Sequence, residues 1–230
     1  MTQKSALLIL TSHRQLGDTG RGTGFYFDEM AAPYWALVDH GWDVTIASVA
    51  GGQAHADPKT LVEADKRPIM VARFMDNQQA MDKLSRTAKA SEADPTNYQC
   101  VFLPGGHGAM WDFDDLTIGQ IITEAWANGA VIGAVCHGPA GLLQATAENG
   151  EPLVRGKKVN SFTDAETRQI ELVGVEPFLL ETRLRELGGL FECSDNFTSH
   201  AVQDGRLITG QNPQSTVAVC QLLTEALDRL

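Results

Sequence analysis

The segment from Ala130 to Leu143 constrains the fold more than any other part of the chain. It places a short apolar run, Val131 to Val135, directly before Cys136, and small residues follow. Such a run predicts a buried parallel strand, and Gly138 leaves room for a sharp turn that pushes the apical side chain out of the sheet. The pattern therefore predicts a nucleophile elbow with Cys136 at its apex.

The position of Cys136 also predicts its chemistry. The N–H groups at the start of the following helix would favour the thiolate, which predicts a lowered pKa for Cys136. The alternative is a buried, inert cysteine at the end of a strand, which is the commonest fate of this residue in globular proteins. The local pattern leaves both interpretations open.

Length and composition favour one domain over residues 1–230. The chain is 43% hydrophobic, and no linker or low-complexity tract divides it. Its formal net charge of −11 would repel phosphate backbones and anionic lipids, so we expect no nucleic-acid partner and no membrane partner. The apolar run at residues 6–10 is too short for a signal peptide, and we expect a cytoplasmic protein.

Cysteine and histidine spacing gives no metal motif. The cysteines are widely separated, at Cys100, Cys136, Cys193 and Cys220. Reduced thiols are expected rather than a disulfide framework. No local ligand spacing occurs among the histidines, although a site assembled in space from His13, His107 or His200 stays open. We expect no metal and no organic cofactor.

Strand-like and helix-like runs alternate along the chain. Short apolar runs predict strands at residues 6–10, 43–48, 100–103, 131–135 and 158–162, and amphipathic runs predict helices at 28–40, 76–88, 116–128 and 216–230. Residues 51–68 are typical of a long irregular segment, and residues 191–210 of a strand pair that turns at Asp204-Gly205. The alternation predicts an α/β fold with a mainly parallel sheet, helices on both faces and a small β-hairpin excursion. Ligands bind at the carboxyl ends of the strands in such sheets.

Two further strand ends carry unusual residues. Pro104 to Gly108 is a glycine-rich turn that could be only a tight connection. Close to an exposed nucleophile it would form an oxyanion hole with the N–H of His137. Glu29 follows an aromatic, glycine-rich loop and could be a simple first-turn acid. Buried beside Cys136, its pKa would rise, and it could exchange a proton at neutral pH.

These motifs together resemble one known superfamily. They are Val135-Cys136-His137-Gly138-Pro139-Ala140, Leu103-Pro104-Gly105-Gly106-His107-Gly108, Gly24-Phe25-Tyr26 with Glu29, and Gly210-Gln211-Asn212-Pro213-Gln214-Ser215. The chain is similar to the PfpI and Parkinsonism-associated-protein superfamily, specifically its heat-shock-chaperone and glyoxalase III branch. The resemblance implies a flavodoxin-like doubly wound sheet, a homodimer, and glutathione-independent conversion of methylglyoxal to lactate.

The resemblance also excludes one relative and leaves other activities open. Class I glutamine amidotransferases need a late His-x-Glu pair, whereas His200 is followed here by Ala201 and Val202. Deglycation of early sugar adducts, peptidase action and the holding of unfolded chains are also associated with the superfamily. Unfolded or glycated proteins are therefore alternative partners. A stress-related holdase would use an exposed apolar surface, and a redox sensor would oxidise Cys136.

The implied reaction assigns roles to specific residues. The Cys136 thiolate would attack the aldehyde of a 2-oxoaldehyde, and the N–H groups of Gly106 and His137 would hold the oxyanion. Glu29 or the His137 side chain would carry the proton between the two carbons, as expected of a cofactor-independent lyase. Gly105 would belong to the same substrate-binding turn. The small pocket would be lined by Phe25, Tyr26 and Trp111.

The third member of the triad is the point at which the chain departs from its apparent relatives. The segment after the next strand is Phe162-Thr163-Asp164-Ala165-Glu166-Thr167, and Thr167 occupies the position of the family acid. A threonine hydroxyl can accept a hydrogen bond from an imidazole but cannot stabilise an imidazolium as a carboxylate does. We predict that Glu166 orients His137, with Thr167 as the alternative and Asp164 as the lesser acid.

Overall fold

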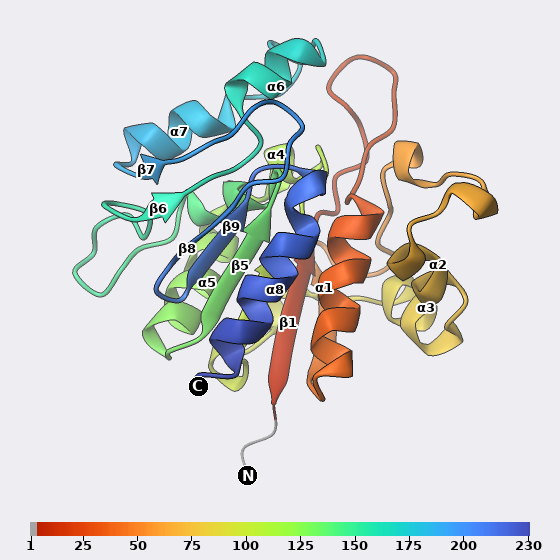
Figure 1. Cartoon of the computed structure of the whole chain (residues 1–230), viewed down its shortest axis with the longest axis horizontal. Coiled ribbons are helices and arrows are strands. Elements are labelled where there is room, and N and C mark those ends of the chain that lie inside the picture. Colours follow the sequence, from red (N-terminus) through yellow and green to blue (C-terminus); the bar gives the residue numbers. More distant parts are fainter. Residues whose placement is uncertain (1–3) are drawn as a thin grey trace.

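The computed structural model describes residues 4–230, so the first three residues of the predicted domain lie outside it. A seven-stranded sheet in the order β3-β2-β1-β4-β5-β9-β8 forms its centre (Figure 1). Its strands are β1 (Ser5–Leu10), β2 (Asp43–Ser48), β3 (Ala88–Lys89), β4 (Cys100–Leu103), β5 (Val131–Val135), β8 (Ala201–Asp204) and β9 (Leu207–Gly210). Neighbouring strands are parallel except for the antiparallel pair of β8 and β9.

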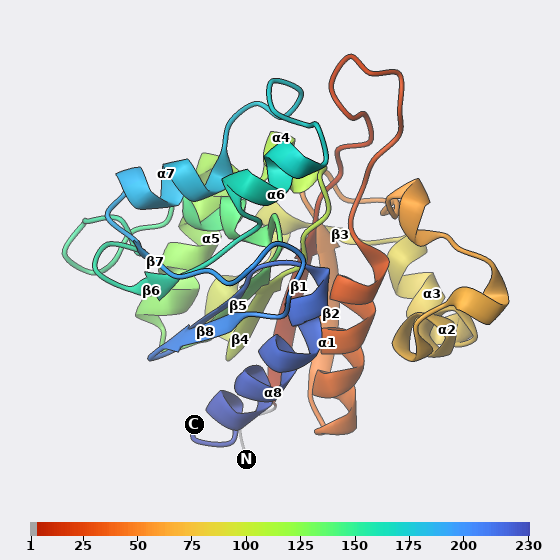
Figure 2. The same cartoon turned by 45° about the horizontal axis from the view of Figure 1, so that its top comes forward.

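Helices cover both faces of this sheet. Helices α1 (Phe27–Asp39) and α8 (Thr216–Leu227) pack on one face, and α5 (Leu116–Ala127) packs on the other (Figures 1 and 2). Side chains alternate along β1 as a pleated strand requires, so Leu8 and Leu10 enter the core under α1 and α8, whereas Leu7 and Ile9 enter the core under α5. The predicted doubly wound α/β fold is confirmed.

The connection between β2 and β4 differs in part from the expectation. Residues 51–68 are irregular as predicted, with only the short 3-10 turns Pro58–Thr60 and Ala64–Lys66, and α2 (Ile69–Met75) follows them. The predicted helix 76–88 is the shorter α3 (Gln78–Ser85). Asn77 caps its first turn by accepting the N–H of Ala80, and Ala88 joins β3.

The segment between β5 and β8 forms a layer over the carboxyl ends of the central strands (Figure 2). It contains β6 (Lys158–Val159), α6 (Asp164–Gln169), α7 (Leu180–Glu186) and β7 (Leu190–Phe191), with β6 and β7 paired in a separate small sheet. The predicted strand 158–162 was wrong beyond Val159, because Asn160 donates its backbone N–H to the side chain of Thr209. The predicted strand pair that turns at Asp204-Gly205 is confirmed as the antiparallel β8 and β9. The predicted excursion is corrected, since this pair completes the central sheet instead of leaving it.

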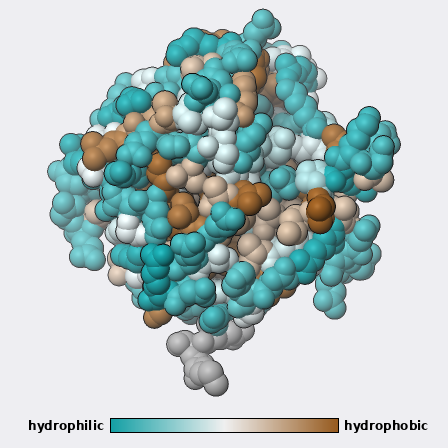
Figure 3. All heavy atoms as spheres, viewed as in Figure 1, coloured by the Kyte–Doolittle hydropathy of each residue, from teal (hydrophilic) through white to brown (hydrophobic). Residues whose placement is uncertain are grey.

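One face of the molecule is mostly hydrophilic. Hydrophilic residues cover most of the face that carries α1 and α8, and small apolar patches lie between them (Figure 3). Val217 at the start of α8 is an exposed apolar side chain in this region. Within residues 4–230, every helix is too short or too polar to cross a bilayer.

Candidate active site

The elbow at Cys136 has the predicted geometry. Strand β5 ends at Val135, and a 3-10 turn, Gly138–Leu142, begins two residues after Cys136. Cys136 has φ of 60°, a value that a residue with a Cβ adopts at an energetic cost. A Cβ at Gly138 would collide with the carbonyl oxygen of Leu103, so only glycine permits this close approach of β4 to the turn.

Glu29 lies in the first turn of α1 and is fully buried. Its Oε2 accepts the backbone N–H of Gly105 at 2.9 Å, and its Oε1 is buried without an aligned hydrogen-bond partner. Burial raises the pKa of Glu29 well above its usual range, although hydrogen bonds from Cys136 and Gly105 partly oppose the rise. The predicted juxtaposition of this carboxyl and the thiol is therefore present.

The pKa of the Cys136 thiol differs from the expectation. The backbone N–H groups of Gly106 and His137 do lower the pKa of Cys136, but burial and the neighbouring Glu29 raise it well above its usual range. The predicted depression of the pKa was wrong, because a cysteine with 3% exposure loses its hydration and faces a carboxylate. Ionisation of Cys136 is easiest while Glu29 holds a proton, since two adjacent negative charges in a buried site repel each other.

The N–H groups of the glycine-rich turn point at two different acceptors, the Glu29 carboxyl and the Cys136 sulfur. Gly105 donates to Glu29, so its N–H is not free for an oxyanion. Gly106 and His137 instead direct their N–H groups at the Cys136 sulfur. Gly106 has φ of 104°, and a Cβ there would collide with the carbonyl oxygen of Gly24. The predicted oxyanion hole can thus be built from Gly106 and His137, with Gly105 as the support of Glu29.

His137 connects the thiol to a carboxylate that was not among the predicted site residues. Its Nδ1 lies 3.2 Å from the Cys136 sulfur, and its Nε2 lies 3.2 Å from Oε1 of Glu176. The geometry at Nε2 is poor for a hydrogen bond, so the contact between His137 and Glu176 is an ion pair that forms when His137 is protonated. Oε1 of Glu176 also lies 2.7 Å from Nδ1 of His107. Cys136, His137 and Glu176 form a thiol, imidazole and carboxylate series of the kind that activates nucleophiles.

The pKa shifts of Glu176 and His107 indicate the charge of each group at pH 7. Burial alone would raise the pKa of Glu176, but His137 and His107 outweigh burial, and the pKa falls to about 2. Glu176 is therefore ionised throughout the physiological range. Burial lowers the pKa of His107 despite the hydrogen bond to Glu176, which favours the neutral ring at pH 7.

Glu166 does not contact His137, so the prediction that it orients this histidine was wrong. Its Oε1 accepts the backbone N–H of Phe197 and the side-chain amides of Gln211 and Asn212. Its Oε2 accepts the N–H of Thr163 in a capping box at the start of α6. Glu166 is a buried structural anchor that ties α6 to the segment before β8 and to the loop after β9.

Within residues 4–230, Asp164 and Thr167 also form no hydrogen bond with His137, whose side chain contacts Cys136 and Glu176. Asp164 binds the hydroxyl of Thr182 in α7, and Thr167 donates its backbone N–H to Thr163 within α6. Glu176 reaches the site because the chain turns back after α6, with the N–H groups of Val175 and Glu176 both donated to the Leu172 carbonyl. A sequence signal was available, since Glu176 is a lone acid in the apolar run Val175-Glu176-Pro177-Phe178-Leu179.

The three residues predicted to line the pocket, Phe25, Tyr26 and Trp111, differ in burial and in the groups they contact. Phe25 is buried in the core against Phe27, so it supports the site without lining it. Tyr26 is half-buried, and burial, followed by the nearby Glu29 and Cys136 charges, raises its pKa to about 12. Trp111 stacks on His13 at 4.8 Å between ring centroids. Phe162 packs on the His137 ring at 4.6 Å and was not predicted.

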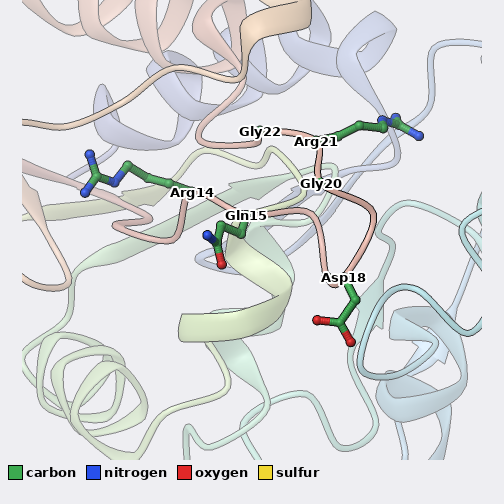
Figure 4. Close-up of a pocket in the computed structure, with 7 residues that line it drawn as sticks. Arg14, Gln15, Asp18, Gly20, Arg21 and Gly22 are labelled. Atoms are coloured by element: carbon green, nitrogen blue, oxygen red, sulfur yellow. The ribbon is translucent and has the colours of Figure 1, made fainter.

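A separate hollow lies in the loop between β1 and α1. It has a volume of about 450 Å³ and is lined by Arg14, Gln15, Gly17, Asp18, Gly20, Arg21 and Gly22 (Figure 4). Its two arginine side chains point away from each other, so they do not converge on one anion (Figure 4). We place the chemistry at Cys136 because the reactive groups are gathered there.

One group within residues 4–230 has the composition of a metal site. The ligand atoms of His107, His137 and Glu176 all lie within 4.8 Å of one another. They already contact each other through one carboxylate oxygen, and we interpret them as a hydrogen-bonded relay. The spatial group suggested by the sequence is not assembled, since His13 stacks on Trp111 and His200 contacts Asn160 and Ser215 through its backbone.

The comparison with known families decides the identity of this fold and site. Residues 23–226 match the DJ-1/PfpI family. The chain belongs to that family. It is 31% identical to Glyoxalase 3 of Candida albicans over 96% of this chain and 98% of the relative. It is 30% identical to the glutathione-independent glyoxalase HSP31 of Saccharomyces cerevisiae over 99% of both chains.

Solved structures agree with this assignment. The structure of Rapid Encystment Protein 24 KDa from Francisella tularensis superposes with a TM-score of 0.92 at 29% identity, covering 98% of this chain and 99% of the other. Glyoxalase III from Candida albicans superposes with a TM-score of 0.88 at 28% identity, covering 98% of each chain. The DJ-1/PfpI architecture is thus shared over nearly the whole length.

Proposed function

We propose that this DJ-1/PfpI protein is a glutathione-independent glyoxalase that converts methylglyoxal and related 2-oxoaldehydes to 2-hydroxy acids. One observation carries the proposal. The buried Cys136 thiol lies between the Glu29 carboxyl, with its unpartnered Oε1, and the His137–Glu176 pair. The glyoxalase names of the relatives support this chemistry. We assign the reaction to the lyases, because its reverse removes water from a 2-hydroxy acid to give a 2-oxoaldehyde.

The first step forms a carbon–sulfur bond. The thiolate of Cys136 attacks the aldehyde carbon, and the carbonyl electron pair moves to oxygen, where the N–H groups of Gly106 and His137 stabilise it. The thiol proton passes to His137, whose Nδ1 lies 3.2 Å from the sulfur. Glu176 stabilises the resulting imidazolium, since it is ionised and in contact with Nε2.

The second step moves hydrogen between the two carbons of the adduct. Oε1 of Glu29 removes the proton from the former aldehyde carbon and returns it to the neighbouring carbon. The His137 imidazolium gives the thiol proton to the oxygen on that neighbouring carbon, which leaves a 2-hydroxy thioester on Cys136. The raised pKa of Glu29 suits this exchange at neutral pH. Water then cleaves the thioester to lactate and the free thiol.

The test is consumption of methylglyoxal in the absence of glutathione, with chiral detection of lactate. Wild-type protein should form lactate, and Cys136→Ser should not. If wild-type protein removes methylglyoxal without forming a 2-hydroxy acid, the glyoxalase proposal fails. Suppression of client aggregation that survives Cys136→Ser would then support the holdase alternative.

We also propose that the protein is a cytoplasmic homodimer. The resemblance to the superfamily supports the dimer, and the four free cysteines, of which Cys193 is exposed, suit a reducing compartment. Light scattering on the purified protein measures the first property. A single-chain mass at micromolar concentration would contradict the dimer.

A further inference from the structure

His107 is a second oriented histidine in this site. Its Nδ1 lies 2.7 Å from Oε1 of Glu176, so this nitrogen carries the proton and donates it to the carboxylate. Its Nε2 then holds a lone pair, and it has no hydrogen-bond partner among residues 4–230. Two histidines are thus oriented by one carboxylate, but only His137 has a task in the steps described above.

Exposure separates the two histidines. The His107 side chain is 14% exposed, whereas that of His137 is 2% exposed. Cys136 is 3% exposed and Glu29 is fully buried. Of these four groups, His107 is therefore the one that water can reach from solvent.

The glycine-rich turn places His107 close to the groups that surround Cys136. It directly follows Gly106, whose N–H is directed at the Cys136 sulfur, and its ring centroid lies 4.6 Å from that of His137. Because the His107 side chain is the more exposed of the two, a water at its Nε2 could enter from solvent. The last step of the proposed reaction requires such a water, because hydrolysis of a thioester to an acid needs an oxygen nucleophile.

We propose that His107 is the general base that activates this water for hydrolysis of the acyl-thioester on Cys136. The proposal rests on the glyoxalase function proposed above. Nε2 accepts a proton from water as the water oxygen bonds to the thioester carbon. The tetrahedral adduct then expels the Cys136 sulfur as a thiolate, the proton that His107 took from water restores the thiol, and the acid is released.

The electrostatics of the relay support a base at this position. The pKa of His107 is lowered, so the ring is neutral and able to accept a proton at pH 7. Glu176 stabilises the imidazolium that forms, as a carboxylate does behind a catalytic histidine. Because Glu176 contacts both rings, the two histidines act in turn, with His137 cationic during thiol attack and His107 cationic during hydrolysis.

The test is a chemical identification of the enzyme species that accumulates. His107→Asn is mixed with methylglyoxal, freed of excess substrate by rapid desalting, and examined by intact mass spectrometry. The hemithioacetal and the 2-hydroxy thioester have equal mass, so a second portion is treated with hydroxylamine after desalting. Only the thioester yields lactohydroxamate, whereas the hemithioacetal releases methylglyoxal. His40→Gln, which changes a surface histidine at the end of α1, is the matched control.

The expected result is a stable adduct on His107→Asn that hydroxylamine converts to lactohydroxamate, with steady-state turnover reduced by about 10²- to 10⁴-fold. Adduct formation itself should keep its wild-type rate, which a folding defect would not allow. His107→Gln provides a second variant if the asparagine form is unstable. Wild-type turnover in both variants, or an adduct that yields no hydroxamate, overturns the role of His107 while the glyoxalase function stands. Absence of lactate and adduct with wild-type protein overturns both proposals.

Discussion

Nε2 of His137 lies 3.2 Å from Oε1 of Glu176, and this contact joins the nucleophile elbow to the loop after α6. Glu176 is thereby the carboxylate that completes the series beginning at Cys136. The same oxygen lies 2.7 Å from His107, so the carboxylate is shared between two imidazole rings. With the buried Glu29 on the other side of the thiol, the site depends on the charge of two carboxyl groups that have opposite pKa shifts.

Glu176→Gln should lower methylglyoxal turnover by about 10²-fold or more. The amide keeps the size of the side chain but cannot stabilise the imidazolium form of His137. A pH–rate profile checks the cause, since the hydrogen bond and charge of Glu176 raise the pKa of His107, and their loss should shift the limb of that histidine to lower pH. Near wild-type turnover with an unchanged profile would show that Glu176 has only a structural role.

Glu166→Gln should instead affect stability. Its two carboxylate oxygens accept hydrogen bonds from Phe197, Asn212 and Thr163 in a buried site. Gln keeps one accepting oxygen, but its NH₂ cannot accept the bonds made to the other. We expect a loss of about 3 kcal/mol or more in the free energy of unfolding, measured by urea denaturation. Activity per folded molecule should fall much less than in Glu176→Gln. The opposite ranking would restore Glu166 as the triad acid.

The sequence predicts much of this fold because its signals are local. The apolar runs before Pro104 and Cys136 identify β4 and β5, and glycine at 106 and 138 marks turns that a Cβ would block. Strand ends then predict that the reactive groups meet at one edge of a parallel sheet. The amino-acid pattern alone is therefore enough to bring Cys136 and Glu29 together.

The third carboxylate could not be predicted in the same way. Glu166 and Glu176 lie on the same layer, and the choice between them depends on how the chain turns after α6. Glu166 forms a capping box with Thr163, a local motif that is visible in the sequence. Because the motif uses the Glu166 carboxylate, that group is not available to orient His137. Glu176 reaches His137 through tertiary contacts, which periodicity and spacing do not encode.

Glu29→Gln should stabilise the protein more at about pH 8 than at about pH 5. The folded-state pKa of Glu29 is raised, so the folded chain binds this proton more tightly than the unfolded chain does. Its contribution to stability is therefore present below the unfolded pKa and is lost as pH rises through the folded pKa. Gln carries no titrating proton and avoids this loss. Thermal melts at the two pH values test the prediction, and an equal shift at both would contradict it.

Alkylation should reveal the coupling between Glu29 and Cys136. At neutral pH, iodoacetamide should first modify Cys193, which is exposed, because burial raises the pKa of Cys136, Cys100 and Cys220. Glu29→Gln removes a negative charge beside the thiol, which lowers the pKa of Cys136 and should accelerate its modification.

The matched control for this alkylation is Asp28→Asn, which removes the neighbouring acid of the same helical turn. Asp28 is not among the charges that shift the pKa of Cys136 and acts on it only through Glu29, whose pKa it raises, so its loss should change the Cys136 rate much less than Glu29→Gln does. Peptide mass spectrometry over time separates the rates of the four cysteines. If Glu29→Gln slows Cys136 instead, the carboxyl is already protonated in the resting enzyme and stabilises the thiolate as a hydrogen-bond donor.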